Sequence, residues 1–403
     1  ALQARYSAEA VAFRYLASNP AVTGDSVEIV LPDSSSGTVT AEPFGGFLKV
    51  ISKASAGSQN KTIRMLIGEK PPSQFRNAVV LGDIRSGLHL TGETNITGDV
   101  ETGPFGVKYS LFKGKHFEGT FDGNTIASDS STVPEFDSRM FERQIDEFNH
   151  ILKGPSDEMN ILKPGRYRAA DFAKETSPAI IYSQGDLEFF SLNQTQWTTP
   201  LTIITKGSVT LTGNIRYAPF TRIIAGKQIV LEGEVKGEHA LFYAAEELFI
   251  RGTVNGAGQF LAGEKIHVSD DVYLRYPSVL YLRGRIEENV RDGHLELSGN
   301  SILDGIAIIP APRQIISDDK LLLTIGKDAR IRGAVYNAGK TELHGKVSGS
   351  LLTFQFYFYH SPTTFINWVK DASINITERP DPFTIPVGFA GDTTYKILDW
   401  REL

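Results

Sequence analysis

A short phrase recurs along this chain: an apolar residue, any residue, glycine, any residue, and a β-branched apolar residue. It occurs at Ile96–Val100, Leu211–Ile215, Leu231–Val235, Ile250–Val254, Ile331–Val335 and Leu343–Val347. Gly213, Gly233 and Gly252 are spaced 20 and 19 residues apart, and Asp271 lies 19 residues beyond Gly252. Such a regular spacing is typical of repeat proteins. Each repeat would form one coil of a parallel β-solenoid, because a strand of about five residues cannot bury its apolar face alone.

Composition narrows the class of protein. The 403 residues are 41% hydrophobic and 10% aromatic, which is enough for a folded core. The 41 basic and 47 acidic residues give a net charge of −6, so the charge balance offers no reason to expect nucleic acid or anionic lipid as a partner. The chain has no cysteine, which excludes disulfides, thiolate metal sites and cysteine nucleophiles.

The N-terminal part, residues 1–76, is expected to form a helix followed by a small sheet. Tyr6, Ala10, Phe13 and Leu16 fall on one helical stripe within residues 1–18. Alternating apolar and polar residues then predict antiparallel strands, among them residues 26–30, 46–51 and 62–67. This part is therefore predicted to be α+β.

The rest of the chain is predicted to be β-solenoid with one internal helix. Residues 77–164 would form a first solenoid piece and a helix between Pro134 and Gly154, where Phe141, Ile145, Phe148 and Leu152 recur at helical spacing. The main solenoid would span residues 165–353, with Ile215, Val235, Val254 and Val272 stacked inward as one ladder. The aromatic residues of 354–403 would cover its open end. The register is unclear between Tyr276 and Lys320, where Glu287–Asn289 and Ser317–Asp319 suggest excursions from the coil.

Residue patterns that usually carry chemistry are weak in this chain. The recurring glycines are not followed by a helix or by Gly-Lys-Ser or Gly-Lys-Thr, so they are interpreted as coil corners rather than a phosphate loop. The eight histidines form no HxH or HExxH pair, which gives no reason to expect a metal site. Asp270–Asp271 and Asp318–Asp319 could supply paired carboxylates, but neighbours on a strand point to opposite faces, and solvated turns are the simpler reading. No catalytic residue and no cofactor is predicted.

One aromatic cluster is the candidate contact surface. Tyr273, Tyr276 and Tyr281 lie in the region of unclear register, interleaved with Arg275, Arg283 and Arg285. Exposed rings of this kind could stack on sugars, while packing in the core or in a lateral loop is the competing explanation.

Two resemblances add to this reading. The glycine phrase is similar to the repeats of bactofilin-like polymer-forming β-solenoids. Three segments more closely resemble an uncharacterised, minor-pilin-like family of bacterial envelope proteins: residues 25–29 through 43–47 to 64–68, residues 90–100 with 106–108, and residues 374–377 through 386–388 to 396–400. The resemblance implies a periplasmic or surface-exposed location and a membrane anchor upstream of Ala1, of which residues 1–18 would be the soluble continuation.

Two classes of function remain open. The first is a non-catalytic structural or adhesive protein that presents a rigid solenoid to a glycan or to an envelope protein. The alternative is a β-helical polysaccharide lyase or glycoside hydrolase, which needs several charged residues at equivalent positions of successive coils. Glu232 and Arg251 occupy such positions but alternate in sign, so they form no row of carboxylates. The structural class is therefore preferred.

Overall fold

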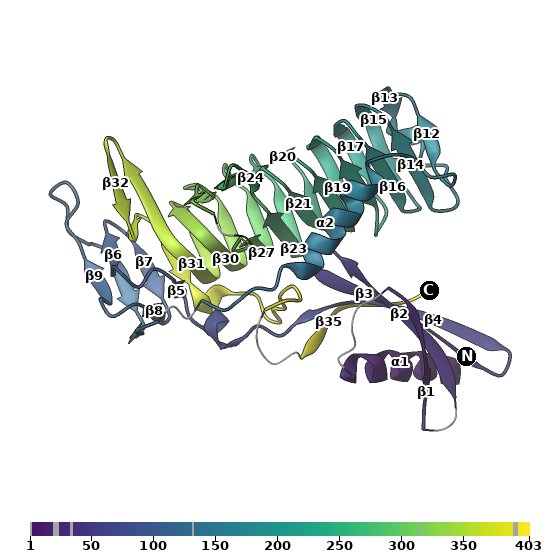
Figure 1. The fold of residues 1–403 in the computed structure, drawn as a ribbon, viewed down its shortest axis with the longest axis horizontal. Coiled ribbons are helices and arrows are strands. Elements are labelled where there is room, and N and C mark those ends of the chain that lie inside the picture. The colour runs from purple at the N-terminus through teal and green to yellow at the C-terminus, as the bar shows by residue number, and fades with distance from the viewer. Residues whose placement is uncertain are drawn as a thin grey trace. The chain divides into compact units, whose positions relative to one another are not determined.

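The computed structural model describes residues 2–18, 24–32, 35–130, 133–312, 314, 316–389 and 394–403. These residues group into two compact units. Unit 1 contains Ala1–Pro72, Asp137–Gln144 and Phe383–Leu403, and unit 2 contains Ser73–Phe136 and Ile145–Pro382. The structure confirms a mainly β chain with an N-terminal helix, a small antiparallel sheet, one internal α-helix and a large parallel sheet (Figure 1).

Unit 1 is a helix packed on a five-stranded antiparallel sheet. The strand order is β1-β2-β3-β4-β35. The elements are α1 (Leu2–Ala17), β1 (Ser26–Val30), β2 (Ser36–Phe44), β3 (Phe47–Ala56), β4 (Gln59–Glu69) and β35 (Tyr395–Glu402). The predicted strands lie within β1, β3 and β4, whereas β2 and β35 are additional. The last strand of the chain therefore completes the sheet that the first four begin.

The buried face of α1 differs from the predicted stripe. Tyr6 and Phe13 are 58% and 50% exposed. The face against the sheet consists mainly of small residues, namely Ala4, Ser7, Ala8, Val11, Ala12 and Tyr15. Small side chains let the helix backbone approach the sheet closely, and Ser52 on β3 donates a hydrogen bond of 2.8 Å to the backbone carbonyl of Ala8. Close packing, rather than the size of the apolar side chains, selects this face.

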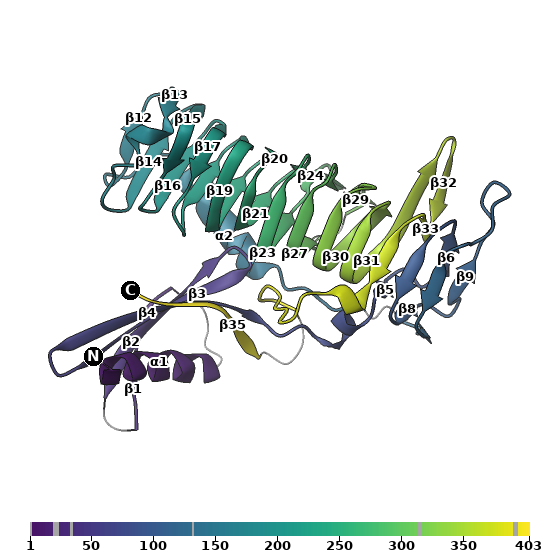
Figure 2. The same ribbon diagram turned by 180° about the vertical axis from the view of Figure 1, so that it is seen from behind.

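Unit 2 is dominated by parallel strands, which lie side by side in both views (Figures 1 and 2). Its strands are β5 (Val79–Leu81), β6 (Leu88–Thr91), β7 (Asn95–Thr97), β8 (Val100–Thr102), β9 (Val107–Tyr109), β10 (Thr120–Asp122), β11 (Thr125–Ala127), β12 (Asn160–Leu162), β13 (Gly165–Arg168), β14 (Ala179–Ser183), β15 (Leu187–Gln196), β16 (Leu201–Thr205), β17 (Val209–Arg216), β18 (Arg222–Ala225), β19 (Gln228–Ala244), β20 (Glu247–Gly252), β21 (Asn255–Ala262), β22 (Lys265–Val268), β23 (Tyr273–Leu282), β24 (Arg285–Glu287), β25 (Val290–Asp292), β26 (His294–Leu297), β27 (Ile302–Ile309), β28 (Asp318–Asp319), β29 (Leu322–Ile325), β30 (Arg330–Leu343), β31 (Lys346–His360), β32 (Thr363–Ile366), β33 (Trp368–Lys370) and β34 (Ser373–Asn375). Three short 3₁₀ helices, η1 (Ser73–Arg76), η2 (Ala169–Asp171) and η3 (Ile376–Glu378), accompany them.

The repeated glycine phrase sets the register of these strands. Gly213 on β17 lies opposite Gly233 on β19, which lies opposite Gly252 on β20. Gly213 has φ +94°, and a Cβ atom there would lie 2.0 Å from the carbonyl oxygen of Ser191 on the neighbouring strand. Both the positive φ and this close approach require glycine. The phrase therefore marks corners where backbones of successive repeats come together, as predicted.

One apolar interior runs through unit 2. Ile215 lies opposite Val235, and the register of the residues that follow places Val254 and Val272 at equivalent positions. All four are at most 1% exposed and belong to the same core, as predicted. Long strands such as β19, which pairs with β17, β18, β20 and β21, link the ladders into a single sheet. The parallel sheet thus closes around this core.

The early segment of unit 2 continues the parallel ladder beyond β31. Residues 351–353 of β31 lie opposite β5, β5 pairs with β8, and β8 pairs with β11. In the second ladder β31 is followed by β34, β7 and β10. The strands of residues 77–127 therefore lie next to β31 and β34 in space, and the blue strands stand beside the yellow ones in Figure 1. The aromatic run Phe354–Tyr359 lies within β31 itself.

The internal helix is α2 (Arg139–Ile151). The four apolar residues that predict it, Phe141, Ile145, Phe148 and Leu152, are at most 8% exposed. Within unit 2, the ring of Phe148 lies 5.2 Å from that of Tyr243 on β19, and Tyr243 Oη donates to Asn149 Oδ1 at 2.9 Å. The C-terminal part of α2 therefore packs against β19.

Candidate functional site: a charged groove beside a side sheet

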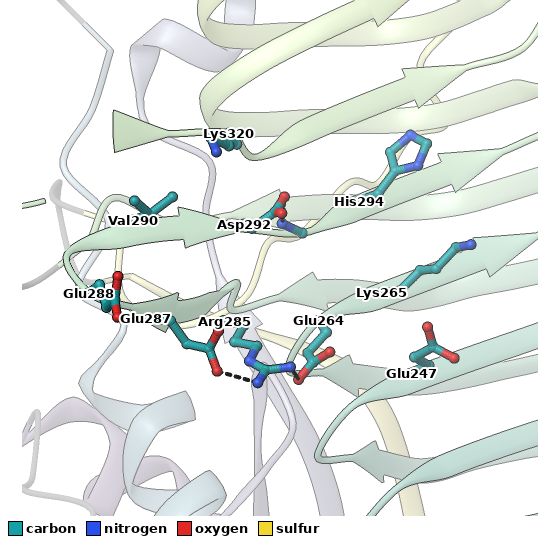
Figure 3. A pocket seen from close by; sticks show the side chains of 11 residues that line it. Glu247, Glu264, Lys265, Arg285, Glu287, Glu288, Val290, Asp292, His294 and Lys320 are labelled. Atoms are coloured by element: carbon teal, nitrogen blue, oxygen red, sulfur yellow. Dashed lines mark hydrogen bonds and ion pairs between the residues drawn. The ribbon is translucent and has the colours of Figure 1, made fainter. Parts of the chain in front are cut away.

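A groove of about 920 Å³ lies on unit 2. It lies where β20, β22 and β26 run beside a small side sheet, and charged side chains dominate its lining (Figure 3). The lining residues are Glu247, Glu264, Lys265, Arg285, Glu287, Glu288, Val290, Asp292, Gly293, His294 and Lys320. Ligand sites are usually concave, although most have a more apolar lining than this groove, so the groove is a candidate contact surface.

Strand register brings three of these residues into one column. Glu247 on β20 lies opposite Lys265 on β22, which lies opposite His294 on β26. The next residue of each strand, Leu248, Ile266 and Leu295, is fully buried in the core. Because side chains alternate along a strand, the column faces away from the core. Residues 47 positions apart in sequence thus form one wall of the groove.

The opposite wall is the predicted excursion from the coil. β24 and β25 form an antiparallel hairpin, and β28 pairs with β25 in parallel. Glu288 and Asn289 connect the hairpin with φ values of +48° and +65°. Two consecutive positive φ values are the signature of the tight hairpin turn that suits twisted strands.

A buried ion pair holds the side sheet in place. Arg291 on β25 is 1% exposed. Its guanidinium donates to Asp319 Oδ2 at 2.7 Å and to the carbonyl oxygen of Pro310 at 2.7 Å. The prediction of a solvated turn at Asp318–Asp319 is wrong, since the doublet forms the short strand β28. The carboxylate of Asp319 neutralises the buried guanidinium of Arg291.

One cation bridges two carboxylates within the groove. Arg285 Nη1 lies 3.1 Å from Glu264 Oε1, and Arg285 Nη2 forms a close ion pair with Glu287 (Figure 3). Glycosidic cleavage by an acid and a base needs two carboxyl groups that are free to reach the scissile bond. Here both are tied to the same guanidinium.

Burial is the main cause that lowers the pKa of His294 below its ordinary value, while the carboxylate of Glu296 opposes the shift and Lys265 adds to it. Its Nε2 atom lies 2.9 Å from Thr324 Oγ1 on β29. A neutral imidazole can donate and accept hydrogen bonds, so it can contact a polar ligand without adding charge. Among the described residues, no group of three or more His, Asp or Glu side chains is arranged to hold a metal ion.

The three tyrosines proposed from the sequence are not brought together as an exposed surface. Tyr281 is fully buried, so its ring cannot stack on a ligand from solvent. Tyr276 is half-buried. Tyr273 is half-buried too, and its hydroxyl lies 2.6 Å from both Asp304 Oδ2 and Arg332 Nη2. None of the three lines the groove.

The doublet Asp270–Asp271 serves a turn, as predicted. Asp270 has φ +62°, and its carboxylate accepts a hydrogen bond of 2.9 Å from the backbone of Gly252. The carboxylate of Asp271 accepts one of 2.9 Å from Asn300. Each carboxylate therefore braces a neighbouring repeat.

Comparisons with known proteins identify no family. No protein-family profile matches the chain, and no curated protein matches it. Among solved structures the chain is similar to the competence-associated pilin ComZ from Thermus thermophilus, at 10% identity over 100% of this chain and 97% of that chain. The TM-score is 0.20, which is too low to establish a shared fold. No helix among the described residues is both long and apolar enough to cross a bilayer.

Proposed function

We propose that this protein is a non-catalytic structural or adhesive component of the bacterial cell envelope, associated with a pilus or a comparable surface assembly. The observation that carries the proposal is the insertion of unit 2 into the sequence of unit 1, between β4 and β35. These two strands pair directly, with Ile67 opposite Ile397. A small unit whose sheet is completed only after a long inserted β unit suits a protein that displays a rigid element.

The envelope location rests on the resemblance of the three sequence segments to minor-pilin-like proteins. Its test is fractionation of cells that produce the protein, probed with an antibody to this chain. An envelope or membrane-attached pool is expected. A pool that is entirely cytosolic would contradict the proposed location.

The inferred partner is a glycan or an envelope protein, and the groove is a contact surface for it. Five carboxylates and three basic side chains line the groove, so a polar ligand can make several charged contacts there. The bridging of Glu264 and Glu287 by Arg285 supports binding without cleavage. A polysaccharide lyase or glycoside hydrolase is the alternative.

A glycan array combined with a reducing-sugar release assay separates these classes. We expect purified protein to bind at least one glycan or, failing that, an envelope extract, and to release no reducing sugar. Release that is lost in Glu264→Gln, with Glu188→Gln on β15 as the control outside the groove, would establish the enzyme instead. Arg285→Ala provides a further check, because it removes a cation from the groove and should alter binding.

We also infer that the parallel sheet of unit 2 winds as a β-solenoid rather than a barrel. In a barrel every strand has a neighbour on both sides. Here the pairings run in one direction, from β12 and β13 through successive repeats to β10 and β11. Among the described residues, each of these four end strands pairs with a single strand of the ladder. Coils stacked along an axis account for this pattern.

A further inference from the structure

The parallel strands of unit 2 have two open ends, with β9 near one and β13 near the other (Figures 1 and 2). Toward the β9 end, each strand pairs with the strand three before it: β9 with β6, β10 with β7 and β11 with β8. The strand that would follow β11 in this pattern, beside β9, is not supplied by the described residues. The last coil therefore ends in a step next to β9.

The apolar core is uncovered at this step. Val107 on β9 and Phe121 on β10 lie opposite the core residues Leu88 and Ile96, so both point inward. Both are nevertheless only half-buried. Tyr109, two residues beyond Val107 and on the same face of β9, is 63% exposed. The core thus ends in an open apolar face.

The opposite end is open in the same way. β12 and β13 begin the ladder, and among the described residues each pairs with one strand of it, β14 and β15 respectively. Leu162 on β12 and Tyr167 on β13 pack against the core but are half-buried. Ile161, on the outer face of β12, is 67% exposed.

We infer that β12 and β13 of a second copy of this chain stack in parallel on β9 and β10. The pairing pattern sets the match, because the next two strands after β11 would lie beside β9 and β10 in turn. β12 and β13 are two consecutive strands that lack a neighbour on their outer edge. Unpaired strand edges are surfaces to which further strands add.

The side chains of the matched strands agree. With inward Tyr167 of β13 beside inward Phe121 of β10, two half-buried aromatic side chains cover each other. Strand alternation then places exposed Arg168 of one copy beside exposed Asp122 of the other. On β12 and β9, the exposed Ile161 falls beside Lys108, whose aliphatic stem can cover it.

The charges of the two ends favour contact between unlike ends. Residues 160–168, which include β12 and β13, contain three basic residues and no acidic one. Residues 117–130, which include β10 and β11, contain three acidic residues and no basic one. Contact between two like ends would bring charges of the same sign together. The second copy is therefore added head to tail.

A head-to-tail contact leaves one end of each copy free, so further copies can be added in the same direction. Two strand pairs and the side chains around them form a small contact, and small protein interfaces associate weakly. The inference rests on the proposed winding as a solenoid and names a partner for it. It goes beyond the proposed function, because self-association needs neither the groove nor a glycan.

Sedimentation equilibrium of the full chain tests this contact. We expect single chains at about 10 µM and, at about 500 µM, an average mass that rises beyond two copies, as weak open-ended association requires. A mass that levels off at two copies would contradict the head-to-tail arrangement. A chain that stays monomeric at the higher concentration would overturn the contact and leave the winding untouched, since the winding concerns one chain alone.

Charge reversal locates the contact. Asp122→Arg and Arg168→Asp should each weaken association roughly fivefold or more, because each places like charges side by side. The double variant should regain most of the association, since it restores the pair with the charges exchanged. Lys227→Asp, at an exposed position between β18 and β19, is the control and should associate like the wild type. Single variants that associate as strongly as the wild type would place the contact elsewhere and overturn the inference.

Discussion

Glu69 gives unit 1 a stability that depends on pH. It is 5% exposed at the end of β4, and its Oε2 atom accepts hydrogen bonds from the backbone of Gly388 at 3.1 Å and Phe389 at 3.2 Å. Burial raises the pKa of this carboxyl from 4.5 to about 7, although the two hydrogen bonds oppose the shift. Between pH 4.5 and 7, Glu69 is therefore mostly protonated in the folded protein and mostly ionised in the unfolded chain.

The sign and size follow from that difference in pKa. Because the folded pKa lies above the unfolded one, the contribution to stability is complete below pH 4.5 and is lost as the pH rises through about 7. At 1.36 kcal/mol for each pKa unit, unit 1 should be about 2–3 kcal/mol more stable at pH 5 than at pH 8.

The variant Glu69→Gln tests this reasoning. A glutamine oxygen can accept the same two backbone hydrogen bonds but does not titrate in this range. Thermal unfolding of the full chain at pH 5, 6, 7 and 8 should show a Tm for unit 1 that rises on acidification in the wild type and is nearly constant in Glu69→Gln. Glu28→Gln, at an exposed position on β1, should behave like the wild type. An equal pH slope in Glu69→Gln and the wild type would refute the role of Glu69.

Two further predictions concern unit 2. Val254→Asp should destabilise the fold by roughly 3–5 kcal/mol, because it places an unpaired charge in the core. The control Thr253→Asp, at an exposed neighbouring position, should cost little. Similar thermal melts for the two variants would contradict the inward ladder. Asp319→Ala should lower the free energy of unfolding in urea by about 2–3 kcal/mol, since it removes the carboxylate that pairs with buried Arg291. Asp318→Ala should lower it by under about 0.5 kcal/mol, because the contact of Asp318 with Lys320 is exposed and 3.9 Å long.

Local patterns predicted the local structure well. Alternation of apolar and polar residues located β1, β3 and β4, and helical spacing located α2. The glycine phrase gave the register of β17, β19 and β20, because each repeat carries its own corner and its own inward residue. These features depend on residues close together in sequence.

Features that depend on distant contacts were not predicted. The pairing of β31 with β5 joins three-residue segments far apart in sequence, which carry no pattern of their own. The buried face of α1 consists mainly of small residues, so the predicted stripe is only partly correct: Ala10 and Leu16 pack against the core, whereas Tyr6 and Phe13 are exposed. Tyr273 and Tyr281 would share one face of a regular strand, but the register of β23 shifts after Leu274 and Tyr281 is buried.

We propose that the parallel strands form one continuous series of coils from β12 to β11. Twelve pairings link these strands through β14, β16, β18, β19, β21, β23, β27, β30, β31, β5 and β8. At about 4.8 Å for each step, the ends should lie about 58 Å apart.

Double electron–electron resonance between two spin labels measures this distance directly. The chain has no cysteine, so Ile161→Cys on β12 and Ile126→Cys on β11 can be labelled specifically, and both positions are exposed. Each single-cysteine variant serves as the control for intermolecular signals. The account predicts one distance near 60 Å, and a distance below about 30 Å, as in a barrel whose end strands meet, would contradict it.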